Sequence, residues 1–145
     1  NEMFYAWEGS KAFLNDVEIQ VSNNSEHQSA LIATGFPYYD MGLLDKYIDS
    51  MREIMAKTSG VRRLGSAAID ICYVACGRFE AFWEYGLHSW DVAAAAFILE
   101  QAGGKVSDFN QTSEYLFNGE IIASNSVYYH KFYEIVHKHL GNISQ

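Results

Sequence analysis

The sequence predicts an α/β fold of the mixed α+β type, in which helices pack on a mixed β-sheet. Segments with helical periodicity alternate along the chain with short β-branched or aromatic segments, an order that favours helices covering a sheet. The 145 residues are 49% hydrophobic, with a single proline and neither a repeat nor a linker. This length and composition can bury one ordinary core, so we expect a single domain over residues 1–145.

The first predicted elements are three short strands. Residues 3–7 and 17–21 are rich in aromatic or β-branched side chains, and residues 12–14 lie between them. Asn15-Asp16 separates the last two strands and predicts a hairpin turn. The polar residues 22–28 predict a loop.

A buried strand and two helices follow. Residues 31–34 are apolar and predict a strand that ends where Gly35-Phe36-Pro37 interrupts it. The first of the two helices is amphipathic, with one apolar stripe formed by Leu44, Tyr47, Ile48, Met51, Ile54 and Met55. The second helix is predicted to begin around Gly65-Ser66-Ala67 and to end at Gly77.

The second half of the chain begins with an aromatic-rich strand at residues 79–85. The next helix starts near Asp91, because Ala and Leu form helices well, and Gly103-Gly104 predicts its C-terminal cap. Apolar residues occur on all its sides, so we expect it to be buried all round. The remaining predicted elements are two strands and a closing helix, at residues 105–107, 121–123 and 127–140.

Charge and hydropathy exclude some classes of partner. The formal net charge is −8, whereas nucleic acids and anionic membranes bind clustered Lys and Arg, so we expect neither as a partner. The longest apolar run, residues 92–99, is far short of the ~20 residues that a membrane span needs. Negative charge suits a protein that collects divalent cations. No secretory leader follows Asn1, so we expect a cytoplasmic protein, and the absent initiator Met indicates a cut or processed piece.

The cysteines and histidines indicate no metal site. Cys72 and Cys76 have neither C-x-x-C spacing nor a further ligand, so we expect buried free thiols. The five histidines form no zinc motif. The last three, His130, His137 and His139, are expected to be surface groups of the closing helix.

Three features indicate chemistry. Arg62-Arg63 precedes a helix start made of small residues, where free backbone N–H groups attract anions or sugar hydroxyls, although small residues there also serve tight packing. Glu84, near the end of the aromatic strand, either accepts hydrogen bonds from a polyol or is simply exposed. Asp91, at the mouth of its helix, either caps the helix by accepting a free backbone N–H or holds a hard cation.

Two longer stretches join these features. R-R-L-G-S-A-A-I-D-I-C-Y-V-A-C-G, from Arg62, and W-D-V-A-A-A-A-F-I-L-E-Q-A-G-G, from Trp90, resemble the C-terminal half of inositol monophosphatases of the bacterial type. The W-D-x-A-A…A-G-G signature is specific to that superfamily. Residues 1–6 and 9–15 resemble the central hairpin of the family, and the similarity reaches about residue 125.

The resemblance implies a Mg²⁺-dependent phosphomonoesterase that hydrolyses inositol or sugar phosphates with a metal-activated water. It makes Asp91 a metal ligand and Glu84 the residue that holds substrate hydroxyls, while Gly65, Ser66 and Ala67 touch the inositol ring. It further implies the C-terminal half of a layered αβαβα sugar-phosphatase fold, in a cytoplasmic homo-oligomer, commonly a dimer.

The resemblance also implies what the chain lacks. The other metal ligands of the family lie in an N-terminal half, in G-x-E-x-x-x-x-E and D-P-[IL]-D-G-T-x-N segments that do not occur here. One carboxylate cannot assemble a site for two or three metal ions, so we expect the chain alone to be inactive. Five further aspartates have no such context and receive no role: Asp16, Asp40, Asp45, Asp49 and Asp70.

Two alternatives stay open. In the first alternative, the chain is a non-catalytic, self-associating interaction module derived from this family, because an uncovered sheet edge and apolar surface favour self-association. In the second, it belongs to a phosphatase with a different substrate, fructose 1,6-bisphosphate or a phosphoadenosine nucleotide. The residues from Phe82 to Asp91 favour inositol phosphates over these.

Overall fold

The computed structural model describes residues 1–38 and 41–142 of the chain. The helices are α1 (Leu44–Lys57), α2 (Ala67–Ala75), α3 (Ser89–Gln101) and α4 (Tyr129–Leu140). The strands are β1 (Phe4–Tyr5), β2 (Ala12–Leu14), β3 (Val17–Ile19), β4 (Leu31–Thr34), β5 (Gly60–Arg62), β6 (Ala81–Tyr85), β7 (Gly104–Ser107) and β8 (Glu120–Asn125). Two short 3₁₀ turns occupy His27–Ser29 and Glu114–Leu116.

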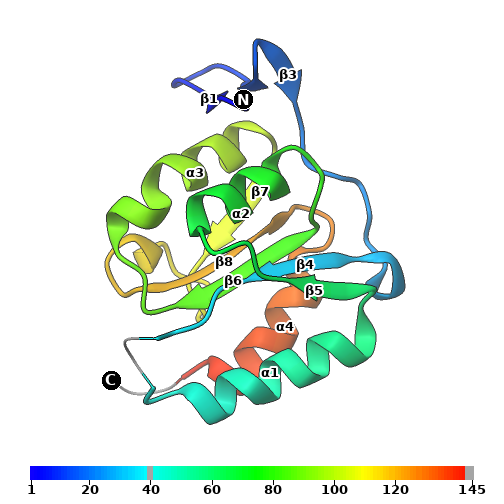
Figure 1. Cartoon of the computed structure of the whole chain (residues 1–145), viewed down its shortest axis with the longest axis vertical. Helices are drawn as coiled ribbons and strands as arrows, with labels where there is room; N and C mark the ends of the chain where they lie inside the picture. Colours follow the sequence, from blue (N-terminus) through cyan, green and yellow to red (C-terminus); the bar gives the residue numbers. More distant parts are fainter. Residues whose placement is uncertain (39–40, 143–145) are drawn as a thin grey trace.

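Five of the strands form the central sheet, in the order β5-β4-β6-β8-β7 (Figure 1). β4 runs parallel to β5 and β6, with Ile32 beside Ala81. β8 runs antiparallel to β6 and β7, with Phe82 beside Ala123. Because β4 and β6 are parallel, their carboxyl ends lie at the same edge of the sheet, which becomes important for the site.

Helices cover both faces of this sheet. α2 and α3 pack together on one face, and α1 and α4 pack together on the other (Figure 1). Neighbouring residues of β6 enter opposite cores, since Phe82 is buried on the α2–α3 side and Trp83 on the α1–α4 side. This alternation follows from the two-residue period of a strand. None of the described helices is both long enough and apolar enough to cross a membrane.

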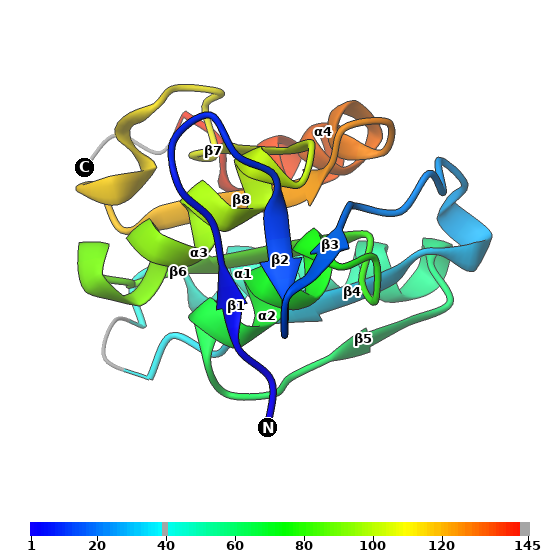
Figure 2. The ribbon, with the colours of Figure 1, turned by 90° about the horizontal axis from the view of Figure 1, so that it is seen from above.

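The first three strands form a separate antiparallel sheet outside the α2–α3 layer (Figure 2). Ala12 of β2 is fully buried in the same core as α2 and α3. Asn15 and Asp16 have φ values of 47° and 65°, which confirms the predicted tight hairpin turn. The layers therefore alternate as sheet, helices, sheet and helices. The mixed α/β prediction is confirmed, and this layering agrees with half of an αβαβα fold.

Helix α3 differs from its prediction. Trp90 is 77% exposed, and Ala93 and Ala94 also face solvent, so the helix is not buried all round. Alanine counts as apolar in the sequence, yet its small side chain tolerates water on one helix face. Only Gly103, with φ of 86°, ends the helix in the left-handed conformation, whereas Gly104 already belongs to β7.

Strand β5 is absent from the predicted elements. Its three residues include Gly60 and the exposed Arg62, and they show no apolar alternation. The strand forms because it pairs in parallel with the edge of β4, which contributes backbone hydrogen bonds that no sequence pattern announces. All the strands and helices that the sequence predicts are found, with ends that shift by a few residues.

The prediction that the histidines of the closing helix are surface groups is wrong for His137 and His139. His139 Nε2 lies 2.7 Å from a carboxylate oxygen of Glu53, and His137 Nδ1 lies 2.7 Å from a backbone carbonyl. Both rings are partly buried, because they face α1 and the loop after β7 rather than solvent. The cysteines agree with the prediction of free thiols, with Cys72 buried and Cys76 half-buried.

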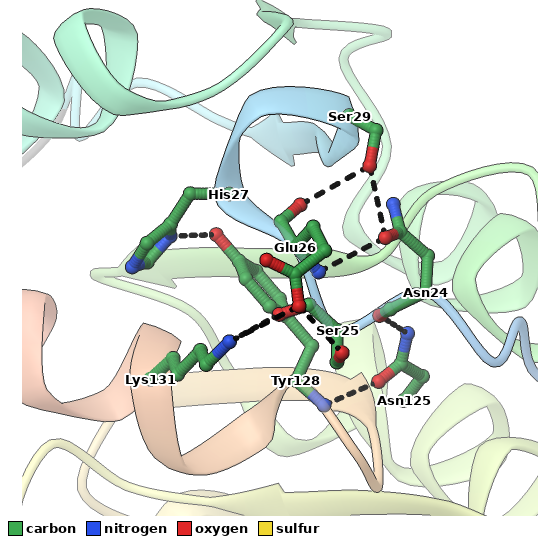
Figure 3. A network of polar contacts seen from close by, with 8 residues as sticks. All are labelled: Asn24, Ser25, Glu26, His27, Ser29, Asn125, Tyr128 and Lys131. Atoms are coloured by element: carbon green, nitrogen blue, oxygen red, sulfur yellow. Dashed lines mark hydrogen bonds and ion pairs between the residues drawn. The ribbon is translucent and has the colours of Figure 1, made fainter.

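The predicted loop at residues 22–28 is fixed by polar contacts to the start of α4 (Figure 3). Asn125 Nδ2 donates to the carbonyl of Asn24 at 3.0 Å, and its Oδ1 accepts from the N–H of Tyr128 at 2.7 Å. Tyr128 Oη lies 2.8 Å from His27 Nδ1. The network precedes β4 in the chain, so it stabilises the end of the sheet opposite to the carboxyl ends of β4 and β6.

Candidate active site

A cavity opens where the parallel strands β4 and β6 end. Its volume is about 540 Å³, and it is lined by residues from three segments, 35–38 after β4, 63–68 before and at the start of α2, and 84–91 from β6 into α3. Ligands of open α/β sheets bind at the carboxyl ends of the strands, where loops diverge. All five residues that the sequence singled out, Gly65, Ser66, Ala67, Glu84 and Asp91, line this one cavity.

Glu84 stands on β6 and is largely buried in the cavity wall, so it is not simply exposed. Burial above all, together with the negative charges of Asp70 and Asp91, raises the pKa of its carboxyl group to about 7. Arg63 acts in the opposite direction. Glu84 therefore changes between its neutral and its ionised form close to neutral pH, which is the range in which a carboxyl group can either donate or accept hydrogen bonds.

The backbone of Gly35 leaves the space that the Glu84 carboxyl group fills. A Cβ at position 35 would lie 2.1 Å from the carboxyl carbon and both oxygens of Glu84. The end of β4 is fixed in turn, because Tyr47 Oη donates to the carbonyl of Gly35 at 2.7 Å and Thr34 Oγ1 donates to the carbonyl of Trp83 at 2.8 Å. These contacts hold β4 and β6 in the register that seats Glu84.

Asp91 is the third residue of α3, which begins at Ser89. Its Oδ2 accepts the backbone N–H of His88 at 3.0 Å, so the capping interpretation is confirmed, and Asp91 and His88 together form a capping box. The side chain is half-buried and faces the same cavity as Glu84. The cap fixes the orientation of the carboxylate and leaves its role as a metal ligand open.

The start of α2 brings backbone N–H groups to the cavity. Gly65 has φ of 96°, a left-handed conformation that favours glycine, and Ser66 is the N-cap residue. The unpaired N–H groups of the first helical turn attract anions and hydroxyl oxygens. Arg63 lies just before this turn, and its guanidinium group is 5.4 Å from the ring centre of Phe36 and 5.5 Å from that of Tyr38.

Aromatic side chains form the rim of the cavity. Trp90 stacks on His88 with 4.4 Å between ring centres, and it remains 77% exposed. Phe36 and Tyr38 stand on the opposite loop and are also exposed. The rim is thus aromatic, with Arg63 against two of its rings, while the wall behind it carries the carboxyl groups.

Asp70 is the residue that sequence reasoning passed over. It lies in α2, is 0% exposed, and neither carboxylate oxygen has a hydrogen-bond partner among the residues that the structure describes. Burial raises the pKa of its carboxyl group to about 7, against the attraction of Arg63. The available signal was an acidic residue between Ile69 and Ile71 in an apolar helix. Asp16, Asp45 and Asp49 are exposed, and Asp40 lies outside the described residues.

The donor set fits a metal ion only in part. Mg²⁺ prefers carboxylate oxygens, and Asp91 offers one at the cavity wall. Within residues 1–38 and 41–142, no three His, Cys, Asp or Glu side chains come together in a group that could hold a metal ion. Asp91 is therefore suited to be one protein ligand, not to form a complete metal site with its neighbours.

Comparison with known proteins gives a consistent picture. A family model described as the inositol monophosphatase family matches residues 1–143. A putative Nus factor SuhB of Neisseria meningitidis is 41% identical over 140 residues, 97% of this chain and 54% of that protein. An inositol-1-monophosphatase of Mesorhizobium japonicum is 39% identical over 141 residues, 97% of this chain and 53% of that protein.

Solved structures agree with these relatives. An inositol monophosphatase from Anabaena superimposes with a TM-score of 0.90 at 35% identity, over 98% of this chain and 58% of that one. An extragenic suppressor protein suhB from Bartonella henselae superimposes with a TM-score of 0.89 at 38% identity, over 94% of this chain and 52% of that one. The chain spans about half the length of the curated relatives that it matches.

Proposed function

The chain belongs to the inositol monophosphatase family, and on that premise we propose that it is the C-terminal portion of a Mg²⁺-dependent phosphomonoesterase. The substrate class is inositol or sugar phosphates, and the attacking group is a metal-activated water. The observation that carries the proposal is that Glu84, Asp91 and the start of α2 line one cavity at the carboxyl ends of two parallel strands.

Each part of the cavity wall has a role in this reaction. The metal, when bound, polarises the phosphate group and activates the water. Asp91 supplies one carboxylate ligand, whose direction is fixed by the hydrogen bond from His88. Glu84 accepts hydroxyl groups of the substrate, and the backbone at Gly65, Ser66 and Ala67 contacts the ring. This division places the phosphate near Asp91 and the polyol near Glu84.

The chain alone is expected to be inactive, because Asp91 is a single ligand and the reaction uses several metal ions. We propose that the remaining ligands come from the part of the family fold that this chain does not span. The reading frame before Asn1 tests this directly, since the proposal expects an in-frame D-P-[IL]-D-G-T segment there. We also propose that the complete protein is a cytoplasmic homo-oligomer.

Phosphate release tests the activity. The complete protein should release phosphate from inositol 1-phosphate when Mg²⁺ is present and stop when it is chelated, while this chain alone should release none. Asp91→Asn should abolish turnover, and Asp49→Asn, an exposed aspartate on α1, should leave it unchanged. Phosphate release by the isolated chain would contradict the assignment of a partial site. A panel with fructose 1,6-bisphosphate and a phosphoadenosine nucleotide separates the substrate alternatives.

A second candidate function is a non-catalytic, self-associating interaction module. Several relatives are named Nus factors, and exposed apolar side chains on and beside the small sheet favour this candidate. Trp7 is 57% exposed and Val17 67% exposed. Sedimentation of the chain tests this candidate: a module that works by self-association must form oligomers, so a monomer at high concentration argues against it.

A further inference from the structure

Asp70 belongs to the same helix as Ala67 and Ala68, which line the cavity. It occupies the first turn of α2, the helix that packs against β6, and Glu84 stands on β6. The Asp70 side chain is 0% exposed, and neither of its carboxylate oxygens has a hydrogen-bond partner among the described residues. Asp70 does not line the cavity, so it reaches a substrate only through a neighbour.

A buried carboxyl group without partners needs an explanation, because an apolar residue of similar size would fill the same space without the cost of desolvating a charge. Within residues 1–38 and 41–142, Asp70 makes neither a capping hydrogen bond nor an ion pair that would stabilise the helix. Its negative charge acts on Tyr47 and on Glu84, and at Glu84 it is the largest effect after burial itself. The clearest electrostatic effect of this buried carboxyl group is therefore on Glu84, a residue of the cavity wall.

The other ionisable groups that interact with Glu84 come from α1, from α3 and from the segment before α2. Asp91 on α3 adds to the effect of Asp70, and Arg63 before α2 opposes both. Tyr47 on α1 is affected by Glu84, and its phenol stays neutral because burial raises its pKa far above the usual range. Among the residues that the structure describes, Asp70 is the one fully buried acid in this group, and Arg63 is the one cation whose charge lowers its pKa.

We propose that Asp70 is a positioning residue whose buried carboxyl group sets the pH range in which Glu84 accepts a hydrogen bond from the substrate. This inference rests on the proposed function, in which Glu84 binds substrate hydroxyls. Two acids that share a poorly solvated region lose their protons in turn, and each keeps the other protonated to higher pH. Only the ionised form of Glu84 accepts hydroxyl hydrogen bonds at both oxygens, so Asp70 places the onset of tight binding near neutral pH.

Carboxyl titration of the chain itself tests the coupling. The side chains are labelled with ¹³C and followed by NMR from pH 4 to pH 9 in the wild type, Asp70→Asn and the surface control Asp49→Asn. Glu84 should titrate at lower pH in Asp70→Asn, by about one unit, and at its wild-type position in the control. Glu84→Gln should lower the titration of Asp70 in return, which keeps the test valid if Asp70→Asn fails to fold. Unchanged titrations in both variants overturn the inference.

Kinetics of the complete protein test the effect on substrate. The pH at which KM for inositol 1-phosphate falls should move down in Asp70→Asn by the same amount as the Glu84 titration, with kcat at its plateau changed by no more than about twofold. A shifted titration with an unshifted KM profile overturns the positioning role. Failure of the wild-type protein to release phosphate contradicts the proposed function instead, and the titration result identifies that case separately.

Discussion

The carboxyl group of Glu84 occupies the space that Gly35 leaves because it has no side chain. A methyl group on Gly35 would overlap the carboxyl carbon and both oxygens of Glu84, at 2.1 Å from each. Gly35 does not have a positive φ, so conformational freedom is not the reason for glycine here. The reason is the close approach of the two strand ends, β4 and β6, at the edge where the cavity opens.

The substitution Gly35→Ala should therefore impair binding more than folding. The overlap involves the free end of a flexible side chain, so Glu84 rotates away from the wall and the backbone stays in place. We expect KM for the substrate to rise about 10–100-fold, the loss of a hydrogen bond to a charged group, while unfolding in urea changes by less than about 1 kcal/mol.

Gly60→Ala is the matched control. Its added methyl would meet the end of the Arg62 side chain at 3.0 Å, again a flexible group, but outside the cavity that Glu84 lines. This variant should keep the wild-type KM. A Gly35→Ala protein with wild-type KM would show that Glu84 does not depend on the space beside Gly35.

Stability should depend on pH through Asp70 and Glu84. Burial raises the pKa of Asp70 from 3.8 to about 7 and that of Glu84 from 4.5 to about 7. For carboxyl groups with raised pKa values, the contribution to stability is fully present below the ordinary pKa and is lost as pH rises through the folded-state pKa. The loss falls between about pH 4 and pH 7. For Asp70 it amounts to ~4 kcal/mol at most, since each pKa unit corresponds to ~1.4 kcal/mol.

The variant Asp70→Asn isolates this effect. Its free energy of unfolding should exceed that of the wild type at pH 8 and approach it or fall below it at pH 5, because the amide carries no charge at either pH. Urea unfolding at the two pH values provides the measurement, with Asp45→Asn on the surface of α1 as the control. Equal pH dependence in the wild type and in Asp70→Asn would show that ionisation of Asp70 does not lower the free energy of unfolding.

The sequence predicts the helices better than it predicts the cavity. The helices follow from apolar spacing or from helix-forming composition, glycine marks the ends of α2 and α3, and the residues around Asp91 follow from the resemblance to a family. Burial of α3 is overpredicted because alanine does not distinguish a buried face from an exposed one. Asp70 is missed for a different reason: its isolation depends on which side chains of β6 face α2, and that is a tertiary fact without a local pattern.

The same limit applies to β5 and Gly35. β5 exists because an edge of β4 is available, not because its own three residues favour a strand. Gly35 looks like an ordinary strand breaker in the sequence, next to Pro37. Its contact with Glu84, 49 residues later, becomes visible only when the parallel pairing of β4 and β6 is known.

Glu53 joins α1 to α4 at the opposite side of the molecule. Its carboxylate accepts hydrogen bonds from Lys57 at 2.8 Å and Lys138 at 2.8 Å, and His139 Nε2 lies 2.7 Å away. These partners hold the pKa of Glu53 down at about 2, so its contribution to stability is present above the ordinary pKa of 4.5 and is lost as pH falls toward 2.

Replacing Glu53 by Gln should lower the free energy of unfolding by about 1–2 kcal/mol near pH 7, more than an isolated surface ion pair contributes. The difference from wild type should shrink at pH 3 and in 1 M salt. Asp49→Gln, which breaks the single exposed pair with Arg52, should cost less than about 0.5 kcal/mol. Equal losses of unfolding free energy in the two variants would mean that the three partners of Glu53 stabilise the protein no more than one surface ion pair does.

Variants of Asp91 separate its two roles, because the cap needs an oxygen and a metal needs a charge. Asp91→Asn keeps an oxygen acceptor for the N–H of His88, so α3 should lose no more than about 0.5 kcal/mol. Asp91→Ala removes the acceptor and should cost about 1 kcal/mol. If Asp91 is also a metal ligand, both variants of the complete protein lose Mg²⁺ binding by calorimetric titration, although only Asp91→Ala is clearly destabilised in urea. Wild-type Mg²⁺ affinity in Asp91→Asn would reduce Asp91 to a helix cap, since an amide oxygen without charge replaces a carboxylate poorly on a hard cation.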